Sequence, residues 1–315
     1  MVKSYLDFEQ PIAEIENKIL ELESSDLSKE VIKSEVISLN ESAVKLTEKI
    51  YSNLTPWQNV QVARHPERPH FIDYIERITD SFDELHGDRH FSDDRAVLGG
   101  IGSIGDYKVV LIGHEKGRTT EEKIEHNFGM SQPEGYRKAC RLMKLAERFK
   151  LPIITLVDTP GAYPGIDSEE RGQSEAIAYN LQIMSSLETP ILVNIVGEGG
   201  SGGALALGVG DHISMLEHAT YSVASPEACA SIVWRDSAMA PQAAEAMKIS
   251  AESILGLKLI DEIIKEPLGG AHRNFDQTSE NLKNSILLSL DRLTQESIPS
   301  LLEARYKRLM DYGSL

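Results

Sequence analysis

The chain has 315 residues, which is long enough for one large domain with an appendage or for two small domains. Hydrophobic residues make up 41% and charged residues 26% of it, ordinary values for a globular protein. The net charge of −17 argues against non-specific nucleic-acid binding, and no apolar stretch reaches the length of a membrane span.

Cysteine content and the first residues bear on the compartment. Cys140 and Cys229 are the only cysteines, too few for a four-cysteine zinc site, and a lone disulfide is unusual in the cytosol. The first seven residues lack the apolar core of a secretory signal. We therefore expect two unreactive thiols, no metal bound by this chain, and a cytoplasmic location.

The beginning of the chain has the pattern of an antiparallel helical pair. Apolar residues recur at helical spacing on both sides of a polar break at 24–26: Ile12, Ile15, Ile19 and Leu22 before it, and Val36, Leu39, Leu46 and Ile50 after it. The repeat is too short for a long coiled coil. We expect a helical segment at 1–50, a main domain at 51–295 and a helical tail at 296–315.

The main domain alternates strands and helices. A hairpin is predicted from strands at 97–104 and 109–112, with its turn at Gly105 and Asp106. Strands follow at 153–157, 191–196, 212–216 and 220–223. Helices are predicted at 134–150, 169–187, 203–209, 226–234, 241–248 and 276–312, the last broken at Pro299. This alternation is typical of an α/β fold with ligands at the carboxyl ends of the strands.

The most informative segment is Gly197-Glu-Gly-Gly-Ser-Gly-Gly-Ala204. It lies between a β-branched apolar run and a short helix-like run. A strand that ends in glycines and opens into a helix exposes unpaired backbone N–H groups, which the helix dipole makes attractive to negative charge. Glycine lets a ligand approach the backbone closely. The segment therefore predicts a cradle for an anion or an oxyanion.

A second loop follows the preceding strand. Asp158-Thr-Pro-Gly161 resembles the D-x-x-G of nucleotide switches, but the chain has no G-x-x-x-x-G-K-[ST] phosphate loop, which argues against nucleotide hydrolysis. The turn residues at 159–165 instead predict a rigid loop that presents backbone amides and Tyr163 to a cleft.

The glycine segment also allows a different class of enzyme. Residues 199–203 match the G-x-S-x-G nucleophile elbow of serine hydrolases, with Ser201 as the nucleophile. The acid of such a triad would be Asp211 or Asp236 and the base His218 or His272. The surplus of glycines argues against this alternative, because an elbow needs only two.

Three further motifs are open to two interpretations each. Arg137, Arg141, Lys144 and Arg148 form one stripe of a predicted helix, either a solvated face or a phosphate-contacting face. The two histidines of 86–90 favour a hydrogen-bonded loop over a metal site. The basic segment 113–118 is either a polar turn or a substrate-lining loop.

Several segments together resemble the alpha subunits of the carboxyltransferase component of bacterial-type acetyl-coenzyme A carboxylase. They are 113–118, 127–130, 133–138, 158–165, 169–175, 197–204, 221–227 and 266–272, together with the start at 6–9. The resemblance runs nearly end to end. One departure is Ala228, where the family commonly has glycine.

The resemblance implies a crotonase-like fold, a spiral of repeated ββα units. It implies an α2β2 assembly with a beta subunit that carries a zinc ribbon. It also implies that this assembly functions together with biotin carboxylase and a biotin carboxyl carrier protein. The implied reaction transfers a carboxyl group from carboxybiotin on the carrier to acetyl-coenzyme A. The product is malonyl-coenzyme A for fatty acid synthesis.

These implications suggest roles for particular residues. We hypothesise that the amides of Gly202 and Gly203 stabilise negative charge on the ureido oxygen of biotin. Gly199 and Gly200 would let the ligand approach the backbone closely. The pocket for biotin would be lined by Gly161, Ala162 and Tyr163. The phosphates of coenzyme A would be contacted by Arg137 or Arg141. A non-catalytic scaffold that completes the partner's fold is the remaining alternative.

Overall fold

The computed structural model describes residues 4–25 and 29–313, with side chains described from residue 32 onward after the gap. The last residue of the predicted polar break, Asp26, lies outside these ranges, as do the ends of the predicted N-terminal and C-terminal segments. None of the described helices is both long and apolar enough to span a membrane.

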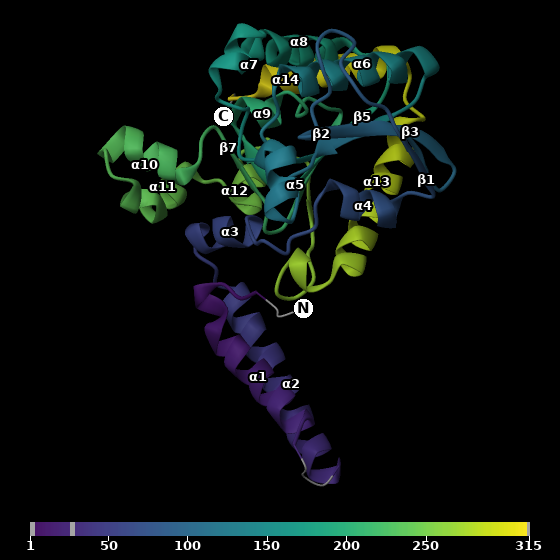
Figure 1. Ribbon diagram of the computed structural model, residues 1–315. Coiled ribbons are helices and arrows are strands. Elements are labelled where there is room, and N and C mark those ends of the chain that lie inside the picture. Colours follow the sequence, from purple (N-terminus) through teal and green to yellow (C-terminus); the bar gives the residue numbers. More distant parts are fainter. Residues whose placement is uncertain (1–3, 26–28, 314–315) are drawn as a thin grey trace.

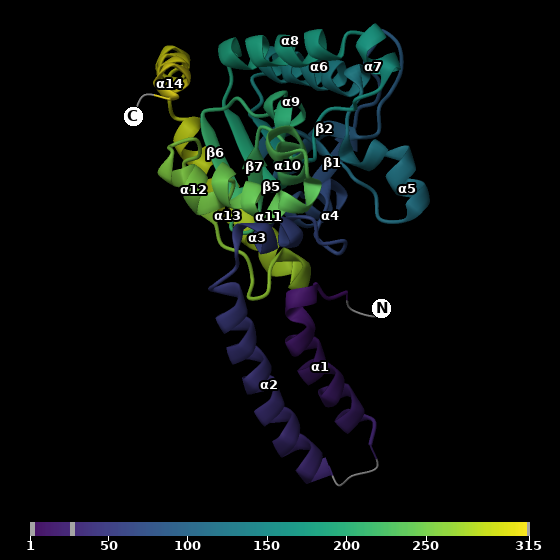
Figure 2. The ribbon, with the colours of Figure 1, turned by 90° about the vertical axis from the view of Figure 1, so that its left-hand side faces the viewer.

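Two helices at the start of the chain form an arm that projects from the body of the molecule (Figures 1 and 2). They are α1 (Gln10–Glu23) and α2 (Lys29–Tyr51), preceded by a short 3-10 turn, η1 (Asp7–Glu9). The predicted helical pair is confirmed. At the base of the arm, the buried carboxylate of Glu9 accepts hydrogen bonds from Tyr51 Oη (2.9 Å) and from Arg273 (3.2 Å). The first bond joins the two ends of the arm, and the bond from Arg273 attaches the arm to the body.

The body is built on one eight-stranded sheet. Its strands are β1 (Ser81–Glu84), β2 (Val97–Ile104), β3 (Tyr107–His114), β4 (Ile153–Thr159), β5 (Ile191–Gly200), β6 (His212–Leu216), β7 (Thr220–Ser222) and β8 (Glu262–Ile264). The order is β1-β2-β3-β4-β5-β6-β8, and β7 pairs with the end of β5. The first three strands are antiparallel and the rest parallel.

Burial explains the pattern of the central strands. Every residue of β4 and β5 is buried, because helices cover the sheet on both faces, so these mainly apolar strands show no alternation of buried and exposed residues. On one face α6 (Pro133–Phe149) and α8 (Gln173–Ser186) lie side by side, and on the other α4 (Phe71–Ile78) packs against α13 (Phe275–Leu293) (Figures 1 and 2).

The remaining helices surround this core. They are α3 (Pro56–Ala63), α5 (Thr120–Glu125), α7 (Ile166–Glu170), α9 (Ser201–Leu205), α10 (Pro226–Trp234), α11 (Ala240–Met247), α12 (Ala251–Gly256) and α14 (Ile298–Asp311), with short 3-10 turns η2 (Asn127–Gly129), η3 (Ser237–Met239) and η4 (Ala271–Arg273). The predicted helix at 226–234 is confirmed: Ser225 caps it by accepting a hydrogen bond from the N–H of Ala228.

Three predicted helix boundaries are wrong. The single helix at 169–187 is two helices, α7 and α8, because Gly172 has a φ of 84° and interrupts the helical path. The helix at 203–209 instead begins at Ser201 and ends at Leu205. The C-terminal break precedes Pro299, which lies in the first turn of α14, where a missing N–H costs no hydrogen bond.

The last helix is joined to the body by a buried charge. Arg305 of α14 forms an ion pair with Asp211 (2.7 Å) and donates to the carbonyl oxygens of Met184, Leu187 and Thr189. Its guanidinium is therefore fully paired inside the protein. The segment predicted as a tail is packed against α8 and the amino end of β6.

Candidate active site

Two loops leave the carboxyl ends of neighbouring parallel strands. β4 and β5 are paired along their length, with Thr159 opposite Gly199 near their ends. The loop at 158–165 and the segment at 197–204 therefore start side by side. In parallel sheets this edge is where ligands bind.

Glycines allow the two loops to touch. A Cβ atom on Gly203 would lie 2.7 Å from the carbonyl carbon of Gly161 and 2.8 Å from the nitrogen of Ala162. A Cβ on Gly200 would lie 2.3 Å from the carbonyl oxygen of Pro160, and one on Gly199 would lie 2.7 Å from the Tyr221 ring. The space beside Gly199 and Gly200 is thus filled by protein atoms, and their role in ligand approach stays a prediction.

Unpaired backbone amides lie where the loops meet. Within the described chain, no acceptor takes a hydrogen bond from the N–H of Ala162, Gly202 or Gly203. Gly202 and Gly203 lie in the first turn of α9, where N–H groups have no partner inside the helix. A Cβ added to Gly202 would make ordinary van der Waals contact, 3.5 Å from its nearest neighbour on Ile177. The geometry provides donors for a negatively charged oxygen.

The position of Tyr163 is set by its own backbone. Its N–H donates to the carbonyl oxygen of Ser131 (3.0 Å), and its carbonyl oxygen accepts from the Gln173 side chain (3.0 Å). The ring lies against Gly165, where a Cβ would come within 2.4 Å of it. The ring is half-buried. Tyr163 follows Ala162 in the chain, so its ring lies in the same loop as the unpaired N–H of Ala162.

The hydrolase alternative finds little geometric support. Ser201 has a φ of 51°, the left-handed conformation typical of an elbow, yet its Oγ makes no hydrogen bond within the described chain. Asp211 is paired with Arg305 at the opposite edge of the strands, and Asp236 caps η3. His218 Nδ1 is instead hydrogen-bonded to Asn59 Oδ1 (3.1 Å).

His272, the other candidate base, belongs to a compact group with Glu9 and His65. The ligand atoms of these three residues lie within 4.8 Å of one another, a spacing that distance alone would allow for a metal ion. The two imidazole rings, however, stack with centroids 3.7 Å apart and planes 16° apart. Their in-plane lone pairs therefore run side by side and do not converge on one point. The group joins the arm to the body.

A buried network of charges, which sequence analysis missed, holds the two loops together. Lys116 Nζ lies 2.6 Å from Asp158 Oδ1 and 2.9 Å from Glu198 Oε2. Arg64 lies 2.6 Å from Glu198 and also 2.6 Å from Glu227 of α10. A signal was present, because Asp158 and Glu198 are lone carboxylates at the ends of two apolar strands. Such charges need partners when buried.

The protonation states in this network follow from its charges. Burial alone would raise the pKa of Glu198, but the Lys116 and Arg64 charges lower it to about 2. Burial opposes the charge on Lys116, and Asp158 and Glu198 outweigh it and raise the pKa of the amine. Burial and then the Lys116 charge lower the pKa of His114 to about 3. Glu198 and Lys116 are thus ionised at neutral pH beside an uncharged His114 imidazole.

The basic segment at 113–118 is largely internal. Glu115 accepts hydrogen bonds from the N–H groups of Ile72 (3.1 Å) and Gly117 (2.9 Å), and Arg118 pairs with Asp73. Lys116 and Gly117 also line a cleft of about 300 Å³ that includes Pro160 and Glu198. The segment thus both supports the loops and borders a cavity.

Arg137 and Arg141 do not lie at the two loops that carry the unpaired amides. They line a larger cleft on α6 and α8, and none of the glycine-loop residues borders that cleft. Arg137 is paired with Asp88 (2.8 Å), while Arg141 donates to backbone carbonyl oxygens, including that of Gly87 (3.0 Å). Their contact with phosphates stays a prediction.

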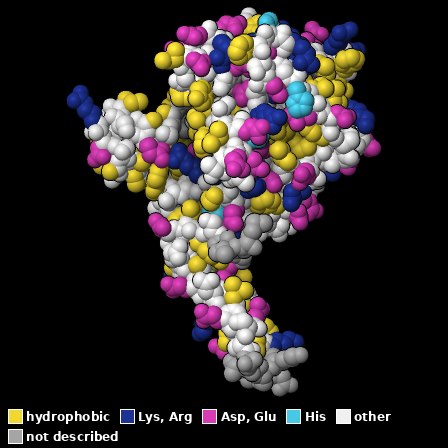
Figure 3. Space-filling view, in the orientation of Figure 1, with side chains coloured by type: hydrophobic (Ala, Val, Ile, Leu, Met, Phe, Trp, Pro, Cys, Tyr) yellow, Lys and Arg dark blue, Asp and Glu magenta, His cyan; other side chains and the backbone are white. Residues whose placement is uncertain are grey.

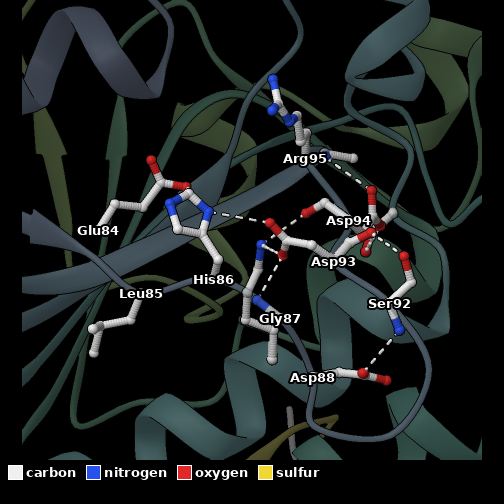
Figure 4. Close-up of polar contacts among 12 residues, drawn as sticks. Glu84, Leu85, His86, Gly87, Asp88, Ser92, Asp93, Asp94 and Arg95 are labelled. Atoms are coloured by element: carbon white, nitrogen blue, oxygen red, sulfur yellow. Dashed lines mark hydrogen bonds and ion pairs between the residues drawn. The ribbon is translucent and has the colours of Figure 1, made fainter.

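The loop before β2 is held by hydrogen bonds, as predicted. Figure 4 shows the His86 ring beside the Asp93 carboxylate, at 3.2 Å, and the N–H of Gly87 donates to the same carboxylate (2.8 Å). Asp88 Oδ1 accepts from the N–H groups of His90 and Phe91 (2.9 and 2.8 Å). These bonds confirm the hydrogen-bonded loop.

Comparison with known proteins gives the family. Residues 5–313 match the family model described as acetyl co-enzyme A carboxylase carboxyltransferase-like. The chain is 58% identical to the acetyl-coenzyme A carboxylase carboxyl transferase subunit alpha of Teredinibacter turnerae, over 99% of this chain and 98% of the relative.

Solved structures support the fold. The chain superposes on transcarboxylase 12S, solved with methylmalonyl-coenzyme A and methylmalonic acid bound, with a TM-score of 0.59 and 16% identity over 73% of this chain and 42% of that one. The beta subunit of geranyl-CoA carboxylase from P. aeruginosa gives a TM-score of 0.55 and 19% identity, over 80% and 46%. The chain thus spans less than half the length of either.

The predicted crotonase-like α/β fold is confirmed, and the chain belongs to the family of acetyl-coenzyme A carboxylase carboxyltransferase alpha subunits.

Proposed function

We propose that this chain provides the carboxybiotin half of a carboxyltransferase site. In this account the assembled enzyme moves a carboxyl group from carboxybiotin on the carrier protein to acetyl-coenzyme A and forms malonyl-coenzyme A. The relatives named as alpha subunits support the reaction class. The observation that carries the assignment to this edge of the sheet is the set of unpaired amides on Ala162, Gly202 and Gly203.

These amides fit the chemistry that the reaction needs. Bound carboxybiotin supplies the carboxyl group. Its departure leaves negative charge on the ureido oxygen, and fixed N–H donors stabilise that charge without reorganising. One such donor contributes about 3–4 kcal/mol to lowering a barrier. The dipole of the first turn of α9 adds positive potential at Gly202 and Gly203.

No side-chain nucleophile is required in this account. The role of this chain is to position donors, and the network around Lys116 keeps the two loops in register. Gly161 and Tyr163 line the same pocket. Gly199 and Gly200 contribute by letting the segment pack against Tyr221 and Pro160, which brings the amides to the surface of the pocket.

The proposed partner on this side is the zinc-ribbon beta subunit in an α2β2 assembly. Apolar side chains are exposed around α10, close to the loops: Val223, Ile232, Val233 and Trp234. Figure 3 shows this lobe standing out from the body, with hydrophobic side chains among polar ones. Arg64 links α10 to the glycine segment through Glu227 and Glu198. We further propose that this assembly works with the biotin carboxyl carrier protein and biotin carboxylase, and that it is located in the cytoplasm.

The test is carboxyl transfer in reverse, from malonyl-coenzyme A to free biocytin. Three samples are assayed: this chain alone, the beta subunit alone, and the two together. We expect transfer only in the mixture, because each chain holds part of the site. Transfer at the full rate by the beta subunit alone would contradict a catalytic role for this chain and favour the scaffold. No transfer by a mixture that forms the complex would contradict the reaction itself.

A further inference from the structure

A second cleft, away from the glycine loops, lies on the outer side of α6 and α8. Its volume is about 860 Å³, within the usual range of small-molecule sites. The cleft is lined by α6, α8, the loop at 88–91 and Arg171, which directly follows α7. The charged and aromatic members are Asp88, Arg89, Phe91, Arg137, Arg141, Lys144, Arg171, Glu175 and Tyr179.

The cleft is cationic in an acidic protein. Five Lys and Arg side chains border it against two carboxylates, although the chain carries a net charge of −17. Arg137 and Arg171 share Glu134 as an acidic partner. In the part of the chain that the structure describes, no carboxylate forms an ion pair with the remaining three: Arg89, Arg141 and Lys144. Their charge is available to an anion from solution.

Arg141 is held in place without being neutralised. Its guanidinium donates to the carbonyl oxygens of Leu85 (3.3 Å), His86 (3.1 Å) and Gly87 (3.0 Å). Burial, and then repulsion from Arg89, lower the pKa of Arg141. An anion between the two guanidiniums would relieve this repulsion. These bonds use Nε and Nη2, and in the described part of the chain Nη1 has no acceptor, so it can donate to a phosphate oxygen.

The loop that forms the rim is rigidly anchored. Asp93 accepts from Lys138 Nζ (2.5 Å) as well as from the N–H of Gly87, and Asp88 accepts from the N–H groups of residues 90–92. Figure 4 shows the bonds from Gly87 to Asp93 and from Ser92 to Asp88. Arg89 is thus presented from an ordered turn. A preorganised rim lowers the entropy cost of binding.

The walls suit a planar ring. Phe91 is 67% exposed, with the Arg171 guanidinium 4.8 Å from its centroid. Tyr179 of α8 also lines the cleft and is exposed, and Lys144 lies 4.8 Å from its centroid. Aromatic and guanidinium faces of this kind stack on nucleobases.

We propose that this cleft binds a nucleotide with clustered phosphate charge, its phosphates between Arg89, Arg141 and Lys144 and its base between Phe91 and Tyr179. Two sources have this chemistry: the 3′-phosphorylated ADP end of coenzyme A, and a free nucleotide such as ATP. The inference does not depend on carboxyl transfer, because it is tested by binding alone.

The experiment is calorimetric titration of the full chain with adenosine 3′,5′-bisphosphate, with ATP and with adenosine. We expect saturable binding of at least one of the two nucleotides and at least tenfold weaker binding of adenosine. Tighter binding of the bisphosphate identifies the coenzyme A end as the ligand, and tighter binding of ATP identifies a free nucleotide; both support the proposal.

Variants locate the site. Arg89→Gln with Lys144→Gln removes two exposed cations of the cleft, and binding is expected to weaken by about tenfold or more, since a hydrogen bond to a charged group is lost with each. Arg148→Gln is the matched control: it removes the same charge from α6, outside the cleft, and should leave binding within about twofold. Absence of saturable binding, or equal losses in the cleft variant and the control, would overturn the proposal.

Discussion

The backbone N–H of Glu198 donates a 2.8 Å hydrogen bond to Asp158 Oδ1, joining the end of β5 to the end of β4. The same carboxylate lies so close to Gly197 that a Cβ there would come within 2.2 Å of it. Lys116 bridges both acidic side chains. The two loops that carry the free amides are therefore positioned as one unit.

Lys116→Met would leave Asp158 and Glu198 buried without their shared cation. Removing one partner of a buried ion pair typically costs about 3–5 kcal/mol, so we expect a loss of that size in the free energy of unfolding, measured by urea titration. The control is Lys123→Met, which removes an amine from the border of the same cleft. Equal stabilities of the two variants would show that the network contributes nothing.

Acid should destabilise the protein through Glu266. Its side chain and that of its partner Arg68 are 0% and 1% exposed, with 2.6 Å between them. Burial alone would raise the pKa of Glu266, but Arg68 and His218 lower it to about 2. Because the folded pKa lies below the unfolded value, the stabilisation is present above about pH 4.5 and is lost as the pH falls toward 2.

The size of this effect is about 3 kcal/mol, the free energy of a pKa difference of this order. Unfolding free energies measured by urea titration at several pH values should decline over that range. Glu266→Gln should be less stable at pH 7 and show a shallower decline. A decline as steep as that of the parent protein would assign the acid sensitivity to other carboxylates.

The helices and strands were largely predictable because their signals are local. The predicted range of α10 matches the structure, since Ser225 and Pro226 are start signals within one turn. The split between α7 and α8 was missed because glycine is also tolerated inside helices. The left-handed φ of Gly172, which ends the helical path, is known only from the structure.

The site was predictable only in part. Glycines between a strand and a helix indicate free amides, and that inference from 197–204 needed no tertiary information. The partners of those glycines did not follow from sequence. Lys116 meets Glu198 across 82 residues, and nothing near Lys116 in the chain indicates this contact. Sequence likewise gives no sign that the 137–148 stripe faces a cleft of its own.

Arg305→Met tests whether the last helix is a separable tail. The change would leave Asp211 buried without its partner and three carbonyl oxygens without a donor. We expect a loss of about 3–5 kcal/mol in the free energy of unfolding. Lys307→Met, an exposed change in the same helix, should cost less than about 0.5 kcal/mol. A small effect at Arg305 would support the tail at 296–315 as a separate unit.

The most direct test of the account compares Gly203→Ala with Ser201→Ala in the assembled complex, by the rate of carboxyl transfer from malonyl-coenzyme A to biocytin. A methyl group on Gly203 must push against Gly161 and Ala162, which displaces the amides, so kcat should fall by about 10²–10³-fold. Ser201→Ala leaves the backbone donors in place and should keep kcat within about threefold of the parent value. Gly203→Ala complexes at the parent rate, or an inactive but assembled Ser201→Ala complex, would contradict the claim that backbone amides carry the reaction.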